Sequence, residues 1–271
     1  MIPPGDWDRL PSRVEATTRT ALSILERCGA RATFFALGWV AARHQALVRE
    51  IRERGHEVAI HGYMHRSIAG MSDPEFLADL RRAREAVEGA TGEPVLGHRA
   101  ARWSLGGIPG AGRRRGASGL LTRALDMMIR EGIEYDASLA PVVWIGDPSW
   151  PLDPYRIERP AGSIQELPPL VGRFLGARLL FGSGWALRRV PSRVLRREIA
   201  RRNKRGAPAI LDLHVWELDP DPPRIELPWV YRIAHYGGLK GFRSKIEELL
   251  AGLLWVPARD YLRGIPGQAS G

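Results

Sequence analysis

Short apolar runs alternate with longer segments of helical periodicity through the first two-thirds of this chain. The apolar runs cover residues 31–37, 57–60, 94–97 and 133–136, and segments with helical spacing lie between them. Strands that alternate with helices of this length indicate βαβ units and a parallel sheet. The pattern therefore predicts an α/β fold.

Local signals place the helices. Capping-box patterns at Ser12–Glu15 and Ser72–Glu75 each open a segment with apolar residues at helical spacing. The second of these helices is expected to run to about Ala90. Further helices are expected over residues 40–54, 120–131, 192–205 and about 242–250, and a late strand over 207–213. The stretch from Gly106 to Gly119 is rich in Gly and Arg and is expected to form a surface loop.

Composition excludes several classes of function. The 271 residues carry a formal net charge of +10, but no zinc-finger, RNP-type or basic-zipper pattern supports nucleic-acid binding. A basic surface can instead attract an acidic polymer, or the charge can simply reflect an Arg-rich composition. The single cysteine, Cys28, allows no internal disulfide. We expect no membrane span, because no run of about 18 apolar residues occurs, and a cytoplasmic location, because the N-terminus lacks a signal-peptide pattern.

Ionisable residues gather where the expected strands end. His61 follows the run at 57–60, Arg99 lies just after the run at 94–97, Asp136 ends the run at 133–136, and His214 follows the late strand. In α/β barrels the working face lies at the carboxyl ends of the strands. We therefore expect these residues to share one site.

His61 and His65 are candidate metal ligands. Their i, i+4 spacing predicts two imidazoles on one face of a helical turn, close enough to hold one ion. Zinc accepts histidine nitrogen, and a catalytic zinc site usually has three protein ligands and a water. Two unrelated histidines are the alternative, but the apolar strand directly before His61 favours a site.

The flanking residues resemble a known family. The segment Gly55-His-Glu-Val-Ala-Ile-His-Gly-Tyr-Met-His-Arg66 resembles the second motif of the polysaccharide deacetylases, the NodB-homology group. Gly97-His-Arg-Ala100 resembles the third motif, and Leu213-His-Val-Trp-Glu-Leu-Asp-Pro220 resembles the fifth. The last segment and His235-Tyr are similar to the branch associated with exosortase and exopolysaccharide gene clusters. The likeness runs from about Asp6 to Leu262.

The resemblance implies a fold and a reaction. It implies a distorted (β/α)7 barrel of the NodB type over residues 1–218, with its first strand missing, and a C-terminal extension over 219–271 packed on the barrel. The implied reaction removes acetyl groups from a polysaccharide or a lipid-linked glycan, and the expected cofactor is a divalent metal, Zn. A related hydrolase of non-peptide C–N bonds is an alternative, because some relatives open cyclic ureides or imides.

The resemblance also implies residue roles. His61 and His65 would bind the metal, and His214 would be the general acid for the leaving amine. Arg99 would orient the catalytic base through a charge-assisted hydrogen bond. Asp136 is a candidate for steering His214, or else a solvated carboxylate at a turn. The aromatic residues Tyr63, Trp103 and Trp216 are candidates for contacting the sugar, and packing in the interior is the alternative.

The first family motif, an apolar strand ending in Asp-Asp or Asp-x-Asp, is not found. This motif would supply the base and the third metal ligand, so we expect both to be absent from the chain. Asp6 and Asp8 are a weak substitute, because the residues before them do not resemble a strand. There are two explanations. Either the start codon is assigned too late, or the chain is a truncated, non-catalytic remnant or sugar-binding protein.

Overall fold

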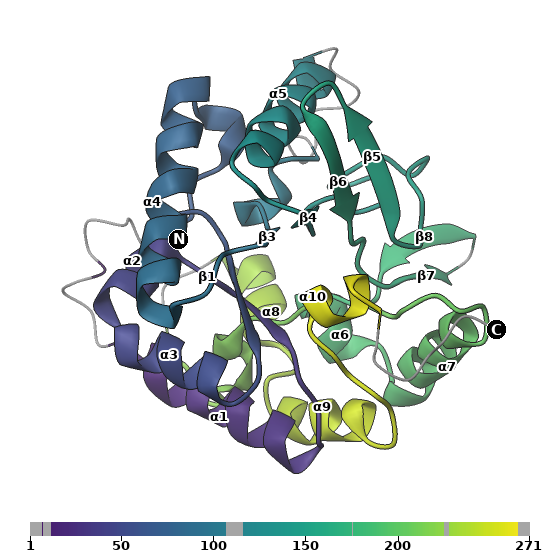
Figure 1. Ribbon diagram of the computed structural model, residues 1–271. Helices are drawn as coiled ribbons and strands as arrows, with labels where there is room; N and C mark the ends of the chain where they lie inside the picture. The colour runs from purple at the N-terminus through teal and green to yellow at the C-terminus, as the bar shows by residue number, and fades with distance from the viewer. Residues whose placement is uncertain (1–6, 8–11, 107–115, 175, 225–227, 265–271) are drawn as a thin grey trace.

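The computed structural model describes residues 7, 12–106, 116–174, 176–224 and 228–264. Asp6, Asp8 and most of the Gly- and Arg-rich stretch at 106–119 lie outside the described residues. The α/β fold is confirmed: five strands of the main sheet run parallel, and helices surround them (Figure 1). The strand order is β1-β2-β3-β4-β6-β5, with β5 antiparallel to β6, and β7 and β8 form a separate hairpin.

The elements follow in chain order. The strands are β1 (Thr33–Ala36), β2 (Glu57–Ile60), β3 (Gly97–His98), β4 (Tyr135–Asp136), β5 (Tyr155–Arg159), β6 (Gly162–Glu166), β7 (Val171–Phe174) and β8 (Ala177–Leu180). The α-helices are α1 (Val14–Arg27), α2 (Gly38–Arg43), α3 (Gln45–Glu53), α4 (Asp73–Thr91), α5 (Gly116–Arg130), α6 (Gly184–Arg189), α7 (Ser192–Asn203), α8 (Trp229–Tyr236), α9 (Phe242–Leu250) and α10 (Ala258–Leu262). The 3-10 turns with described bounds are η2 (Ile68–Gly70), η3 (Ala101–Trp103) and η4 (Val215–Leu218).

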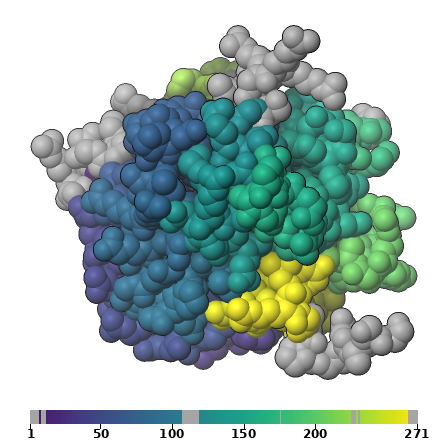
Figure 2. Space-filling model, turned by 45° about the horizontal axis from the view of Figure 1, so that its top comes forward, coloured from purple at the N-terminus to yellow at the C-terminus, as the bar shows by residue number. Residues whose placement is uncertain are grey.

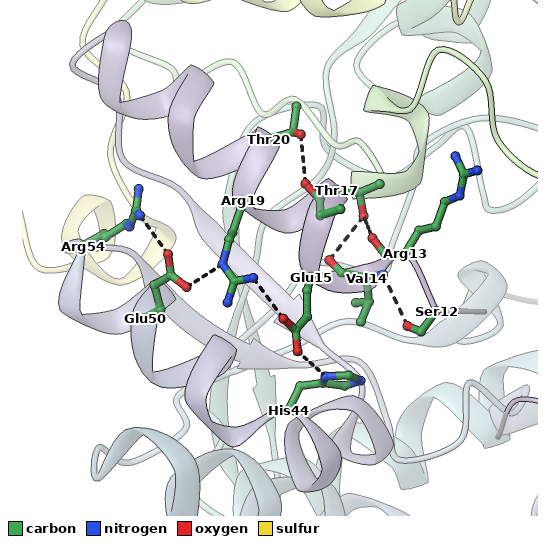
Figure 3. A network of polar contacts seen from close by, with 11 residues as sticks. Ser12, Arg13, Val14, Glu15, Thr17, Arg19, Thr20, His44, Glu50 and Arg54 are labelled. Carbon is green, nitrogen blue, oxygen red and sulfur yellow. Dashed lines mark hydrogen bonds and ion pairs between the residues drawn. The ribbon is translucent and has the colours of Figure 1, made fainter. Parts of the chain in front are cut away.

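The start of α1 differs from the expectation. Its N-cap residue is Arg13, whose side chain makes no capping bond, and the Ser12–Glu15 capping box does not form. Glu15 instead contacts Arg19 on the same helix and His44 across to the α2–α3 junction (Figure 3). The Ser72–Glu75 capping box is confirmed, because the Glu75 carboxylate accepts the Ser72 backbone N–H at 2.8 Å.

Three other expected elements are shorter or interrupted. The helix expected over 40–54 is two helices, α2 and α3, which meet at His44. In place of the strand expected over 94–97, the structure has the two-residue strand β3, Gly97–His98. In place of the strand expected over 207–213, it has an isolated parallel bridge between Ser183 and Asp212. At that bridge the Asp212 N–H donates to the Gly182 carbonyl at 2.6 Å. This pairing sets the place of Asp212 although no regular strand forms.

Two large apolar clusters make up the interior. One lies between the sheet and α2–α5 and includes Ile60, Leu80 and Met128. The other joins α1, α7 and α9 through buried residues such as Ile24, Leu195 and Leu249. The C-terminal part thus packs on the rest of the chain, and the space-filling view shows its yellow segment against the green and teal surface (Figure 2). Among the described helices none is both long and apolar enough to cross a membrane.

Candidate active site

Backbone pairing aligns the residues that follow the strands. The His61 N–H donates to the Ala36 carbonyl at the end of β1, and the Arg99 N–H donates to the Ile60 carbonyl at the end of β2, both at 2.9 Å. The Ala137 N–H continues the series to the His98 carbonyl at 3.0 Å. The carboxyl ends of β2 and β3 therefore bring His61 and Arg99 to the same edge of the sheet.

His61 and His65 meet, but not on a helix. Their ring centroids lie 5.0 Å apart, whereas residues 61–67 form no helical turn. Gly62 and His65 both take left-handed backbone conformations, with φ of 71° and 54°. The expected helical turn is therefore wrong, and a folded-back loop after β2 brings the two rings together.

The state of these imidazoles suits metal binding. The His61 Nδ1–H donates to the Arg99 carbonyl at 2.8 Å, which leaves Nε2 as the nitrogen with a free lone pair. Desolvation and the neighbouring His65 lower the pKa of His61 to about 3, and desolvation and Arg102 lower the pKa of His65. Both rings are therefore neutral near pH 7, the form that binds metal. The pair fits two positions of a zinc site, although the described residues contain no group of three or more potential ligands.

Arg99 holds a carboxylate that the sequence did not single out. Its Nη2 donates to Oδ2 of Asp212 at 2.7 Å, and its guanidinium also lies 4.3 Å from the ring centroid of Trp103. The Ser183 hydroxyl donates to the same Asp212 oxygen at 2.8 Å. Burial raises the pKa of Asp212, but Arg99 and His214 outweigh it and bring the pKa below its ordinary value. Asp212 is therefore an anion at neutral pH.

His214 is fixed by Glu217 and not by Asp136. The Glu217 carboxylate accepts the His214 backbone N–H at 2.8 Å and lies 3.3 Å from the imidazole Nδ1. Partial desolvation lowers the pKa of His214, but the bond to Glu217 and the Asp212 charge raise it above its ordinary value overall. Glu217 in turn forms a buried ion pair with Arg188, whose Nε lies 3.0 Å from Oε1. The side chain of His214 is 55% exposed.

Asp136 serves a different set of partners. Its carboxylate accepts bonds from the Ser138 hydroxyl at 2.8 Å and lies 2.7 Å from His98 Nδ1. The side chain is fully buried, and no contact with His214 is present among the described residues. Asp136 therefore holds His98 and Ser138 in the interior beside the site. It is not a solvated carboxylate at a turn, and among the described residues it does not contact His214.

The candidate aromatic residues differ in exposure. Tyr63 is buried in the core next to α4, with the Arg82 guanidinium 3.9 Å from its ring centroid. Trp103 is partly buried against Arg99, in a turn where its φ is +58°. Trp216 stacks on His235 with ring centroids 4.4 Å apart. Trp103 and Trp216 thus lie beside the polar residues, whereas the Tyr63 ring packs in the interior.

Sequence reasoning missed Asp212 and Glu217. Glu217 lay inside the quoted Trp-Glu segment, three residues after His214, so its spacing carried a usable signal. Asp212 precedes His214 by two residues in an extended segment, where alternate side chains face the same way. That alternation could have placed Asp212 beside His214.

Known proteins match different parts of the chain. Residues 6–106 match the family model "Polysaccharide deacetylase", and residues 137–263 match a domain of unknown function, DUF3473. A peptidoglycan-N-acetylglucosamine deacetylase of Bacillus cereus is 30% identical over 79 residues, which cover 29% of this chain and 37% of that protein. The match therefore spans little more than a third of that relative's length.

Solved structures share the fold over nearly the whole chain. The crystal structure of a polysaccharide deacetylase from Mycobacterium smegmatis, described there as putative, has a TM-score of 0.60 at 24% identity and covers 96% of this chain and 82% of its own. The Puue allantoinase structure has a TM-score of 0.57 at 18% identity, and the match covers 91% of this chain and 71% of the allantoinase chain. These likenesses show the NodB-type α/β fold. The match to the polysaccharide deacetylase model covers residues 6–106 of this chain.

Proposed function

We propose that this protein is a metal-dependent hydrolase that removes acetyl groups from a polysaccharide containing N-acetylhexosamine, an exopolysaccharide or its lipid-linked precursor. The observation that carries the proposal is the placement of His61, His65, Arg99 and His214, the residues given roles by motif. His61 and Arg99 follow neighbouring strands, and Asp212 links Arg99 to the segment of His214. The assignment of zinc, of the sugar and of each role belongs to this proposal.

The residues have separable tasks. A divalent metal bound by His61 and His65 would polarise the acetyl carbonyl and lower the pKa of the attacking water. His214, whose raised pKa keeps a proton available near neutral pH, donates that proton to the leaving amine. Arg99 fixes an anion next to these groups, and Trp103 and Trp216, which pack against Arg99 and His235, are the candidates for contact with the sugar. Hydrolysis of the acetamide yields acetate and a free amine.

Acetate release from penta-N-acetylchitopentaose by the zinc-loaded full chain tests the reaction. We expect release, and a fall of about 100-fold or more in kcat/KM for His214→Ala, the typical contribution of a general acid. His44→Ala is the matched control, because His44 pairs with Glu15 on the outer helices and should change the rate by less than about twofold (Figure 3). No release from this or other acetylated glycans, combined with glycan binding, would identify a sugar-binding protein instead.

Isothermal titration with zinc tests the metal site separately. We expect weak binding by the wild-type chain, because the described residues supply two imidazoles and no third ligand near them. His61→Ala should abolish this binding, and His44→Ala should leave it unchanged. Tight zinc binding that survives His61→Ala would disprove the assignment of the metal ligands.

A further inference from the structure

Large apolar side chains face solvent where α8 packs beside α6. Trp229 and Ile233 are four residues apart on α8, so they share one face of that helix, and Trp185 lies on α6. Each of these three side chains is more than half exposed. Scattered exposed apolar residues are ordinary, whereas large ones gathered on adjacent elements mark a binding surface. Together with Arg189 and Arg232, these residues are called the α8 patch.

Two arginines of α6 hold α8 in place. Arg188 donates to two carbonyls in the last turn of α8, at 2.7 and 3.0 Å, and Arg189 donates to the Ile233 carbonyl at 2.7 Å (Figure 1). Guanidinium groups at this end complement the helix dipole. The Arg189 guanidinium also lies 5.1 Å from the ring centroid of Trp185. Trp185 and Ile233 therefore flank the same charge, and the α8 patch is a fixed part of the fold.

The charge around the α8 patch is positive. The sequences of α6 and α8 contain Arg188, Arg189 and Arg232 but no aspartate or glutamate. Tryptophan beside basic side chains is typical of a membrane interface, where indole rings lie among the headgroups and arginines meet anionic lipid. A second copy of the chain would bring the same positive charges together, which disfavours self-association. A soluble acidic polymer would neutralise the arginines but leave the indole rings in water.

The α8 patch adjoins the proposed general acid. Trp216 stacks on His235 of α8, and its ring centroid lies 6.3 Å from that of His214. Arg188, which holds the end of α8, also pairs with Glu217 beside His214. A surface bound at α8 is therefore only a few side chains away from His214.

We propose that the α8 patch docks this protein on the surface of an anionic membrane. The indole rings and Ile233 enter the headgroup layer, and the arginines face lipid phosphates. Docking brings the acetylated glycan of a lipid-linked substrate next to His214. This last part rests on the proposed deacetylase function, whereas the docking surface itself does not.

Co-sedimentation of the full chain with lipid vesicles tests the docking. The wild type should bind vesicles of phosphatidylcholine with about one-third phosphatidylglycerol at least about tenfold more tightly than pure phosphatidylcholine. The triple variant Trp185→Ser, Trp229→Ser, Ile233→Ser should bind at least about tenfold more weakly. Arg232→Gln should bind about fivefold more weakly, the effect of one charge near an anionic surface. Phe174→Ser is the matched control, because Phe174 on the β7–β8 hairpin is 61% exposed, and it should bind as the wild type does. Melting temperatures show that each variant keeps the fold.

Docking and catalysis can fail separately. The triple variant should release acetate from soluble penta-N-acetylchitopentaose within about twofold of the wild-type rate, because surface substitutions away from the site have small effects. It should be at least about tenfold slower than the wild type when the same oligosaccharide is coupled to a lipid in these vesicles.

A wild type that stays in the supernatant, or vesicle binding that survives the triple substitution, would overturn the docking surface. So would a wild-type dimer that the triple variant loses, since a second copy then covers the patch. Vesicle binding by a wild type that releases no acetate would refute the proposed function and leave the docking surface standing.

Discussion

A single carboxylate sets both the orientation and the charge of the proposed general acid. Glu217 receives the backbone N–H of His214 and lies next to its Nδ1. The Arg188 ion pair keeps Glu217 in place within a nearly water-free environment, with side-chain exposures of 3% and 1%. His214 therefore carries its proton at a higher pH than a free histidine.

Glu217→Gln should move the alkaline limb of the pH–activity profile to lower pH. The charge of Glu217 favours the imidazolium, so its removal lowers the pKa of His214, and a general acid is lost as the pH rises through its own pKa. The profile of kcat/KM measured from pH 5 to 9 checks this. Glu198→Gln, at a surface pair with Arg201, is the control and should leave the limb in place.

The same substitution should also destabilise the fold. It leaves the Arg188 charge buried without its partner, which typically costs about 3–5 kcal/mol. The profile must therefore be measured well below the melting temperature of the variant. A variant that is destabilised but keeps the wild-type alkaline limb would show that Glu217 supports the fold without tuning His214.

Residues of the candidate site were predictable where their motif is local. His61, Arg99 and His214 each follow a strand or extended segment, and the resemblance located them by their immediate neighbours. The partner of Arg99 was not predictable in this way, because Asp212 is 113 residues further along the chain. The same holds for Asp136, whose burial against His98 depends on the pairing of β3 with β4.

At the scale of elements, α2 positions the histidine loop. The backbone N–H groups of Gly38 and Trp39 donate to the carbonyls of Gly62 and Tyr63, at 3.0 and 3.1 Å. A Cβ on Gly38 would lie 2.5 Å from the Tyr63 ring and 2.7 Å from the backbone of Ala83 on α4. The close packing of α2 on α4 therefore requires glycine at this position.

Gly38→Ala should destabilise the protein by about 1–3 kcal/mol, the usual cost of overpacking, and weaken zinc binding because the loop bearing His65 is displaced. Urea unfolding and calorimetry measure the two effects. Gly89→Ala is the control within α4, since a Cβ there meets nothing within 4 Å and alanine is the better helix former by about 1 kcal/mol. Equal stability of the two variants would contradict the packing argument.

Element boundaries were predictable where local sequence decides them. β2 and α9 have the expected ranges, 57–60 and 242–250, because an apolar run and a helical repeat specify them. The break between α2 and α3 at His44 was missed, since the partner of His44 is Glu15 on α1 (Figure 3). The late strand was overestimated, because in the part of the chain that the structure describes it forms an isolated bridge, between Asp212 and Ser183, in place of a ladder.

For the whole molecule, the C-terminal segment connects to the start of the sheet. The Ala258 N–H donates to the Thr33 hydroxyl at 2.8 Å, and the Arg259 N–H donates to the Glu57 carboxylate at 3.0 Å. Thr33 and Glu57 are the first residues of β1 and β2. The predicted division at residue 219 therefore separates two parts that share hydrogen bonds and the apolar cluster of α1, α7 and α9.

Two leucines test whether the parts unfold together. Leu249 is fully buried in that cluster, whereas Leu254, a few residues on, is 68% exposed. Leu249→Ala should lower the free energy of unfolding by about 2–5 kcal/mol, the cost of removing a buried leucine, and Leu254→Ala should change it by about 0.5 kcal/mol or less. If the cluster couples both parts, tryptophan fluorescence and acetate release are lost in one transition that shifts as a whole in Leu249→Ala. Two separated transitions, with only the later one moved, would show that residues 219–271 unfold independently of the sheet.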